Sequence, residues 1–156
     1  MRIATIALAV LAAAACSRTV KVQTDPATGH ADVDVGRPGA NEGWSGTLAP
    51  VGGSGVSGTA RGMSGHDMTM VTVNVNGARP GARLPWHVHE GTCGAGSPPI
   101  VGAASAYPVM TVGADGTATA QAHLNLDLNE AKSYIVNVHA SPTNLGTIVS
   151  CGDYND

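Results

Sequence analysis

The feature that most constrains the fold is a two-residue alternation of apolar and polar side chains in TATAQAHLNLDL, residues 117–128. Ala118 and every second residue through Leu128 fall on one face, whereas His123 and its polar neighbours fall on the other. A period of two is typical of a strand with one buried face. The chain therefore needs a second layer against which such a sheet can bury its apolar face.

Shorter runs of the same kind recur between turns rich in glycine and proline. The 21 Gly and 9 Pro residues, the absence of Phe and the abundance of Ala and Val favour β-structure over a helical bundle. We expect strands at 44–49, 55–62, 69–75, 85–90, 107–112, 117–128, 133–140 and 146–151, with a turn and crossover at 76–83. The prediction is an all-β, immunoglobulin-like Greek-key sandwich or flattened barrel, without substantial helix in the mature domain.

The first fifteen residues have the pattern of a signal peptide. Arg2 precedes an apolar run that is too short to span a bilayer and ends in small residues before Cys16. The string LAAAAC resembles a bacterial lipoprotein cleavage site, although Ala13 stands where such sites usually carry Leu. We expect residues 1–15 to be removed and lipid on Cys16 to anchor the exported protein to a membrane of the cell envelope, facing the periplasm. Secretion with cleavage near Ala15 is the alternative.

Residues 16–42 are polar and are interpreted as a lipid-anchored tether ahead of a folded domain at 43–156. Two alternating stretches, 20–24 and 31–35, flank the turn signal DPATG. They indicate either a small hairpin or a tether with fluctuating β-structure, and the tether is favoured. His30 in this segment is expected to be solvated.

The cysteine count and the charge limit the partners. If Cys16 carries lipid, Cys93 and Cys151 remain as one pair in an oxidising compartment. A bridge closing this loop of about 58 residues would stabilise the fold by roughly 4 kcal/mol. The formal net charge is −3 and no basic cluster occurs, which argues against a nucleic-acid partner.

Three histidines and two cysteines form the main candidate site. His87 and His89 are two residues apart, so both imidazoles project from one face of a strand and can chelate a metal when neutral. Cys93 follows His89 by four residues, and Cys151 follows His139 by twelve. A third imidazole from the distant strand 133–140 would complete a three-nitrogen site suited to copper or zinc.

These two strings resemble the copper/zinc superoxide dismutase family. WHVHEGTCG is similar to its copper-binding strand, where an HxHE motif precedes the first disulfide cysteine. VHASPTNLGTIVSCG is similar to its C-terminal segment, and the resemblance covers roughly residues 44–154. It implies that His87, His89 and His139 bind one catalytic copper ion, and that Cys93 and Cys151 form the family disulfide.

The chain also departs from that family at two places. The loop at 94–105 has no His, Asp or Glu, and between Cys93 and His139 the only histidine is His123, which is assigned to a solvated face. The zinc site and its bridging histidine are therefore missing, so the chain resembles the copper-only branch and no zinc is expected. Ile148 stands where the family has an arginine that attracts superoxide. Arg83 could substitute, but a surface role for it is favoured.

Two smaller features have open interpretations. Met63, His66, Met68 and Met70 lie near a turn and could bind Cu(I) through thioethers. Core packing by the methionines, with His66 exposed, is favoured. Glu90 either orients a metal ligand or lies at an exposed strand end.

The resulting prediction is a copper-dependent enzyme that dismutates superoxide in the cell envelope, with His87, His89 and His139 as its catalytic residues. The alternative is a non-catalytic periplasmic copper buffer or metallochaperone, which could dispense with the arginine. A purely structural sandwich is disfavoured by the paired motifs. The expected partners are superoxide, or a copper donor and acceptor. The sequence does not set the oligomeric state.

Overall fold

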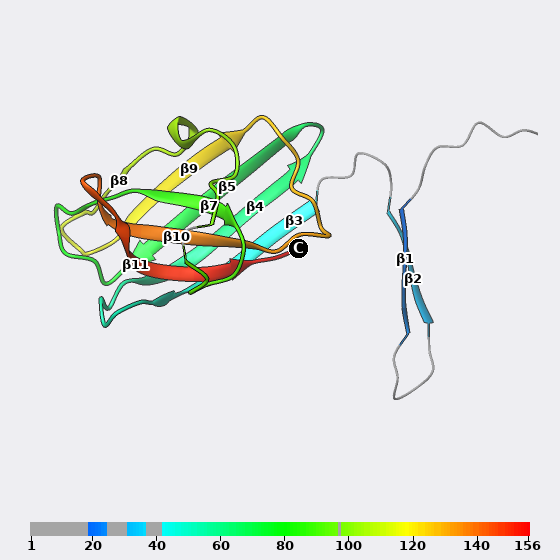
Figure 1. Ribbon diagram of the computed structural model, residues 1–156, viewed down its shortest axis with the longest axis horizontal. Coiled ribbons are helices and arrows are strands. Elements are labelled where there is room, and N and C mark those ends of the chain that lie inside the picture. Colours follow the sequence, from blue (N-terminus) through cyan, green and yellow to red (C-terminus); the bar gives the residue numbers. More distant parts are fainter. Residues whose placement is uncertain (1–18, 25–30, 37–41, 97) are drawn as a thin grey trace, which may run out of the picture. The chain divides into compact units, whose positions relative to one another are not determined.

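The computed structural model of the protein describes residues 19–24, 31–36, 42–96 and 98–156 (Figure 1). The chain divides into two compact units, Met1–Ala40 and Asn41–Asp156. The predicted signal peptide, the lipidation at Cys16 and the assignment of His30 lie outside the described residues. Within the described stretches, no helix is long and apolar enough to cross a membrane.

The first unit contains a two-stranded antiparallel hairpin. Strands β1 (Thr19–Thr24) and β2 (Ala31–Gly36) pair from Thr19 opposite Gly36 to Thr24 opposite Ala31. The described part of this segment is thus the hairpin, the less favoured of the two expectations. Its role as a tether stays a prediction.

The second unit is built on a seven-stranded antiparallel sheet in the order β7-β10-β11-β3-β4-β5-β9, with β6 and β8 forming a separate two-stranded sheet. The large sheet consists of β3 (Glu42–Pro50), β4 (Ser57–Gly65), β5 (Met68–Asn76), β7 (Trp86–Glu90), β9 (Ala118–Leu124), β10 (Tyr134–Ser141) and β11 (Asn144–Tyr154). The small sheet pairs β6 (Arg83–Leu84) with β8 (Met110–Thr111). The helical structure in the described residues is one 3₁₀ turn, Ala104–Ala106, so the all-β prediction is confirmed.

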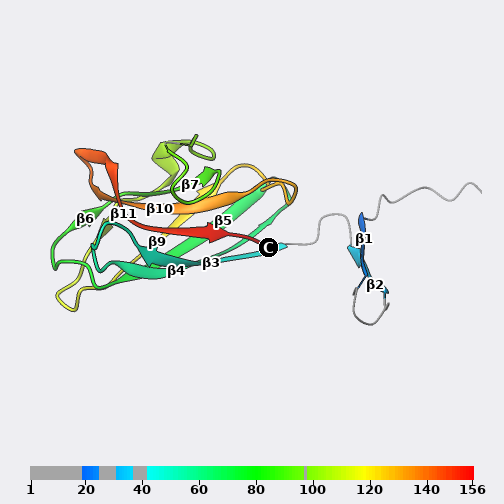
Figure 2. The ribbon, with the colours of Figure 1, turned by 60° about the horizontal axis from the view of Figure 1, so that its bottom comes forward.

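The large sheet curls so that its two ends face each other as layers. Figures 1 and 2 show β7, β10 and β11 lying across β3, β4, β5 and β9. The core fills the space between these layers because each strand directs alternate apolar residues inward. Its members include Trp86, Val88, Val136 and Val138 from one layer, and Val71, Val73, Ala122 and Leu124 from the other. The predicted sandwich or flattened barrel is therefore confirmed.

Three crossovers bring distant segments of the chain together. After β5 the chain passes through β6 and enters β7 at the opposite end of the sheet. It then returns through β8 to β9, which pairs with β5, and crosses again to β10, which pairs with β7. The strands that carry the HxH motif and His139 thus become direct neighbours.

Some element boundaries differ from the sequence prediction. β9 ends at Leu124, where its backbone ladder to β5 ends, although the buried alternation continues to Leu128. The amide of Leu128 donates to Ser64 Oγ, so a side-chain contact replaces the ladder. The expected strand at 107–112 shrinks to β8, and β6 forms where the turn and crossover were expected to end.

Candidate metal centre

The outer face of β7 and β10 presents the three histidines together. Trp86 and Val88 point into the core, so His87 and His89 point to the opposite face. The same parity applies in β10, where the core residues Val136 and Val138 flank Asn137 and precede His139. In the register of the two strands, Asn137 lies opposite His87 and Ile135 lies opposite His89.

A register shift between β10 and β11 accompanies His139. Val138 lies opposite Ser150, whereas His139 lies opposite Ile148, so β11 contains one extra residue at Val149. The amide of His139 donates to the carbonyl of Pro85, at 2.8 Å, just before β7 begins. His139 is thereby fixed next to the HxH strand, although 50 residues separate it from His89.

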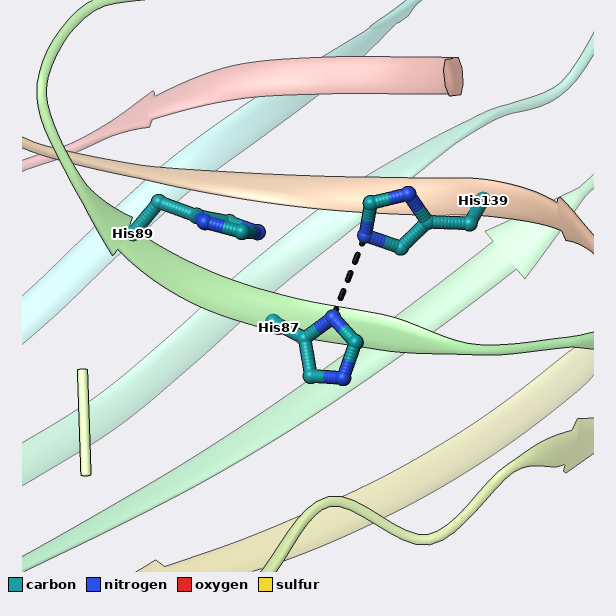
Figure 3. Close-up of side chains that lie close together, drawn as sticks. All are labelled: His87, His89 and His139. Carbon is teal, nitrogen blue, oxygen red and sulfur yellow. Dashed lines mark hydrogen bonds between the residues drawn. The ribbon is translucent and has the colours of Figure 1, made fainter. Parts of the chain in front are cut away.

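The three imidazoles converge, as Figure 3 shows. His87 Nδ1 and His139 Nε2 are 3.1 Å apart, and the ring centroids lie 5.1 to 5.9 Å from one another. One nitrogen from each ring lies within 4.8 Å of the others, and the side chains are only 5 to 6% exposed. If each metal–nitrogen bond is about 2.1 Å long, two nitrogens bound to one ion are at most about 4.2 Å apart. A small rotation of the rings would bring the three nitrogens from their present separations to within this distance. The predicted group can therefore hold a metal ion.

The group contains buried ring nitrogens that lack a hydrogen-bond partner and are therefore available to bind a metal ion. His89 Nδ1 lies 2.8 Å from the carbonyl oxygen of Pro98, which can only accept, so this nitrogen carries the proton. His89 Nε2 therefore holds a lone pair, and it is buried without a hydrogen-bond partner. A buried unsatisfied nitrogen costs about 1–3 kcal/mol, which a metal ion would offset.

The histidines are held in the neutral form that a metal requires. Burial, followed by repulsion from His139 and His89, lowers the pKa of His87 to about 4. Burial also lowers the pKa of His89, against the opposing effect of the Pro98 and Pro99 carbonyls. Burial lowers the pKa of His139 as well, against an opposing contribution from the backbone of Leu145. Near neutral pH, no proton must leave an imidazolium before an ion binds.

A disulfide and a backbone-paired loop cover this face. Cys93 and Cys151 are bonded, with a Cα–Cα distance of 6.0 Å, which confirms the predicted pair. The loop after β7 folds back along the free edge of that strand. The amide of Glu90 donates to the carbonyl of Pro99, and the amide of Val101 donates to the carbonyl of Val88. The carbonyl that orients His89 therefore belongs to a loop tied to β11.

The histidines open into a cavity of about 240 Å³. It is lined by His87, His89, His139, Asn137, Gly96, Pro98, Ile100, Leu145, Gly146 and Ile148. No Lys, Arg, Asp or Glu is among these lining residues, and Ile148 occupies part of the wall. The cavity accordingly offers nitrogen ligands in an otherwise uncharged enclosure.

Among the described residues that line the cavity, Asn137 is the one further polar side chain. It is 2% exposed, and its Oδ1 has no hydrogen-bond partner. Asn137 was not among the site residues expected from the sequence. Its position two residues before His139 in an alternating strand was the available signal, because strand parity directs both side chains into the same space.

The remaining candidates lie away from the metal group. Arg83 is exposed on β6 and does not line the cavity, so the favoured surface role agrees with its position. Glu90 shares the parity of Trp86 and Val88 and pairs with Lys132, Nζ to Oε2 at 2.8 Å. The suggestion that Glu90 orients a ligand is therefore wrong, because it lies at the end of the strand on the face opposite the histidines.

His66, His123 and the three methionines Met63, Met68 and Met70 lie on the β4-β5-β9 side. His123 is exposed on β9, and His66 is exposed in the turn between β4 and β5, as expected. Met63 and Met68 are 46% and 50% exposed, so core packing is the wrong interpretation for these two methionines. Their side chains lie on the opposite face of the sheet from the buried side chains of Ser64 and Thr69.

No protein-family model matches this chain, and no curated protein is significantly similar to it. The resemblance to copper/zinc superoxide dismutases therefore rests on the sequence motifs.

Proposed function

We propose that the protein is a copper-dependent superoxide dismutase of the cell envelope. The observation that carries this proposal is the convergence of His87, His89 and His139, three buried neutral imidazoles, at the floor of an accessible cavity. The sequence motifs that resemble the dismutase family supply these same three residues. The disulfide of that family pattern is also present, between Cys93 and Cys151.

Copper fits the donor set. Imidazole nitrogen suits copper, zinc, iron and nickel, and copper lies highest in the affinity order of divalent first-row metals. Structural zinc sites are closed by four protein ligands, whereas this group supplies three. Three protein ligands would leave a coordination position on the ion free for a small molecule.

Superoxide dismutation requires one-electron chemistry, in which two superoxide ions and two protons yield oxygen and hydrogen peroxide. A copper ion supplies this chemistry by alternating between Cu(II) and Cu(I). The three histidines would hold the ion, and the Pro98 carbonyl fixes the orientation of His89. The walls formed by Ile100, Leu145 and Ile148 restrict access to small species. Protons come from water.

A non-catalytic copper buffer or metallochaperone is the second candidate. The observation that favours it is the absence of any cation among the lining residues, with Ile148 where a dismutase would place an anion-attracting arginine. Such a protein would exchange copper with a donor or acceptor rather than bind superoxide. In both proposals, export and the lipid on Cys16 place the protein at a membrane, facing the periplasm.

Two measurements test the proposal. Titration of the metal-free protein with Cu(II), followed by electron spin resonance, should show nitrogen hyperfine structure and one tightly bound ion. His139→Ala should weaken binding by roughly tenfold or more, whereas the control His66→Asn, at an exposed turn position, should not. Equal Cu(II) affinity in His139→Ala would remove His139 from the site.

The second measurement is superoxide consumption by the copper-loaded protein, compared with the same concentration of free copper. Consumption well above that of free copper supports the enzyme. Tight copper binding without consumption identifies the buffer or metallochaperone instead. Elemental analysis after growth with zinc completes the test, because stoichiometric zinc that survives mild chelation would contradict the expected copper-only composition.

A further inference from the structure

A lateral row of side chains crosses the outer face of the other layer. Met63 on β4 lies opposite Met70 on β5, and Met70 lies opposite His123 on β9. These residues share the outward parity, since Ser64, Thr69 and Leu124 next to them are buried. Directly opposite residues of antiparallel strands have Cβ atoms about 4.5–5.5 Å apart. Two thioethers and one imidazole are thus presented side by side.

We propose that Met63, Met70 and His123 form a surface site for a soft monovalent metal ion, Cu(I) or its analogue Ag(I), separate from the three buried histidines. Thioether sulfur selects Cu(I) over harder cations, and imidazole is a compatible third ligand. Methionine has three rotatable side-chain bonds, so both sulfurs can converge on an ion above His123.

Packing does not explain the exposure of Met63 and of the neighbouring Met68. Met63 and Met68 are two of five large apolar side chains that are exposed in the described residues. Met110, in contrast, is 1% exposed and fills the core. On the neighbouring strand β3, Gly43 lies opposite Met63. A Cβ atom added at Gly43 would meet no other atom within 4 Å, so the space beside Met63 is open.

A hydrogen-bond chain selects the ligand atom of His123. Gln121 Nε2 donates to Thr72 Oγ1 at 3.1 Å, which directs Gln121 Oε1 toward His123 Nε2 at 3.2 Å. Because that oxygen only accepts, His123 Nε2 carries the proton and Nδ1 holds the lone pair. A partner that fixes the tautomer in this way is typical of metal-binding histidines.

The neighbouring charges are mixed. Arg61 lies one row away, opposite Thr72, and it disfavours a cation. At the other side, the Asp127 carboxylate accepts the amides of Asp67 and Met68, at 3.2 Å each, and holds the turn beside the row. Met68 shares the outward face two residues before Met70, so it offers a further sulfur.

This row and the buried histidines lie on opposite outer faces of the sandwich. The row is on the β4-β5-β9 layer and the histidines are on the β7-β10 layer, with the core between them. An ion on the surface row must therefore leave the protein, or pass to another molecule, before it can reach the histidines. The surface row is an independent binding site.

Silver(I) is the probe, because it mimics Cu(I) without redox chemistry. The protein carries ¹³C-labelled methionine methyl groups and is titrated in chloride-free buffer, in wild type and in His139→Ala. We expect the methyl resonances of Met63 and Met70 to shift together, while that of buried Met110 stays in place. The shifts should persist in His139→Ala, so failure of the buried site leaves this test unaffected.

Affinity measurements by calorimetry complete the test. Met63→Leu/Met70→Leu and His123→Gln should each weaken Ag(I) binding roughly tenfold or more. Met110→Leu, a volume-conserving change in the core, is the matched control and should leave it unchanged. Unchanged affinity in the folded double variant, or shifts confined to Met68, would overturn the site. Circular dichroism verifies that each variant is folded.

Discussion

The buried histidines link acidity to the stability of the metal-free protein. The pKa of His87 falls to about 4 in the folded state, from an ordinary value of 6.5, mainly through burial. Between these values the unfolded chain binds a proton that the folded protein does not. The free energy of unfolding therefore decreases as the pH falls from about 6.5 to about 4. Urea unfolding at several pH values should show this decline.

The variant His87→Gln should flatten this pH dependence, because it removes the imidazole whose pKa burial lowers to about 4. His66→Asn, in an exposed turn, is the matched control and should retain the decline. A slope that is identical in wild type and His87→Gln would show that His87 does not contribute to it.

Asn137 is a buried amide that the core does not require. Its Oδ1 lacks a partner and lies beside the metal group. Since an unsatisfied buried polar atom is destabilising, Asn137→Val should raise the free energy of unfolding of the metal-free protein by about 1 kcal/mol. Val also suits a strand. Destabilisation in chemical denaturation would instead show that the amide makes an essential hydrogen bond through water.

At the level of elements, the metal group depends on two strands and one loop. β7 lies at the edge of the sheet, and its free side is paired with the loop that contains Pro98, Pro99 and Val101. The disulfide from Cys93 in this loop to Cys151 in β11 fixes the loop against the layer. The orientation of His89 and the closure of the cavity therefore share one covalent constraint.

Removal of this constraint should affect stability and metal binding together. We expect Cys93→Ser/Cys151→Ser to lower the free energy of unfolding by roughly 2–5 kcal/mol. The copper affinity should also fall, because the Pro98 carbonyl no longer holds His89 in place. Thermal melts with and without copper check both effects. A variant with unchanged melting temperature and copper affinity would show that the bridge is dispensable.

The sequence predicted those elements whose side chains alternate. The strand containing Ala118 to Leu124 and the common face of His87 and His89 followed directly from a period of two. Glu90 could have been assigned correctly by the same parity, as it shares the face of Val88. The short strand β6 and the backbone pairing of the loop with β7 could not, because main-chain hydrogen bonds leave no periodic pattern in the sequence.

Long-range placement was predictable only through the motif resemblance. The chain gives no local signal that β10 lies between β7 and β11, or that a register shift at Val149 accompanies His139. The row formed by Met63, Met70 and His123 was missed because no local signal in the sequence shows which strands pair. The methionines were grouped by proximity in sequence, whereas His123 joins them through the pairing of β5 with β9.

At the scale of the whole molecule, no charged side chain of the described cavity lining guides an anion to the histidines. The formal net charge is −3, and the described lining of the cavity contains no Lys or Arg. A copper-loaded enzyme with this lining would attract superoxide only through the charge of the ion itself, against the weak repulsion of the net negative charge. Its rate should change little with ionic strength, or rise slightly as salt screens the repulsion.

The variant Ile148→Arg tests this account, since Ile148 lines the cavity beside the metal group. A cation there attracts superoxide along the access path, so the copper-loaded variant should consume superoxide roughly tenfold faster or more at low salt. The sign of the salt effect should reverse, because added salt now screens an attraction. Ile148→Gln, polar but uncharged, is the control, and its rate should stay close to that of wild type.

Stopped-flow measurements of superoxide consumption from low to high ionic strength test both expectations. A variant that binds copper normally but gains neither rate nor salt dependence would show that encounter does not limit turnover. If wild type and variant both consume superoxide no faster than free copper, the protein is a copper buffer or metallochaperone.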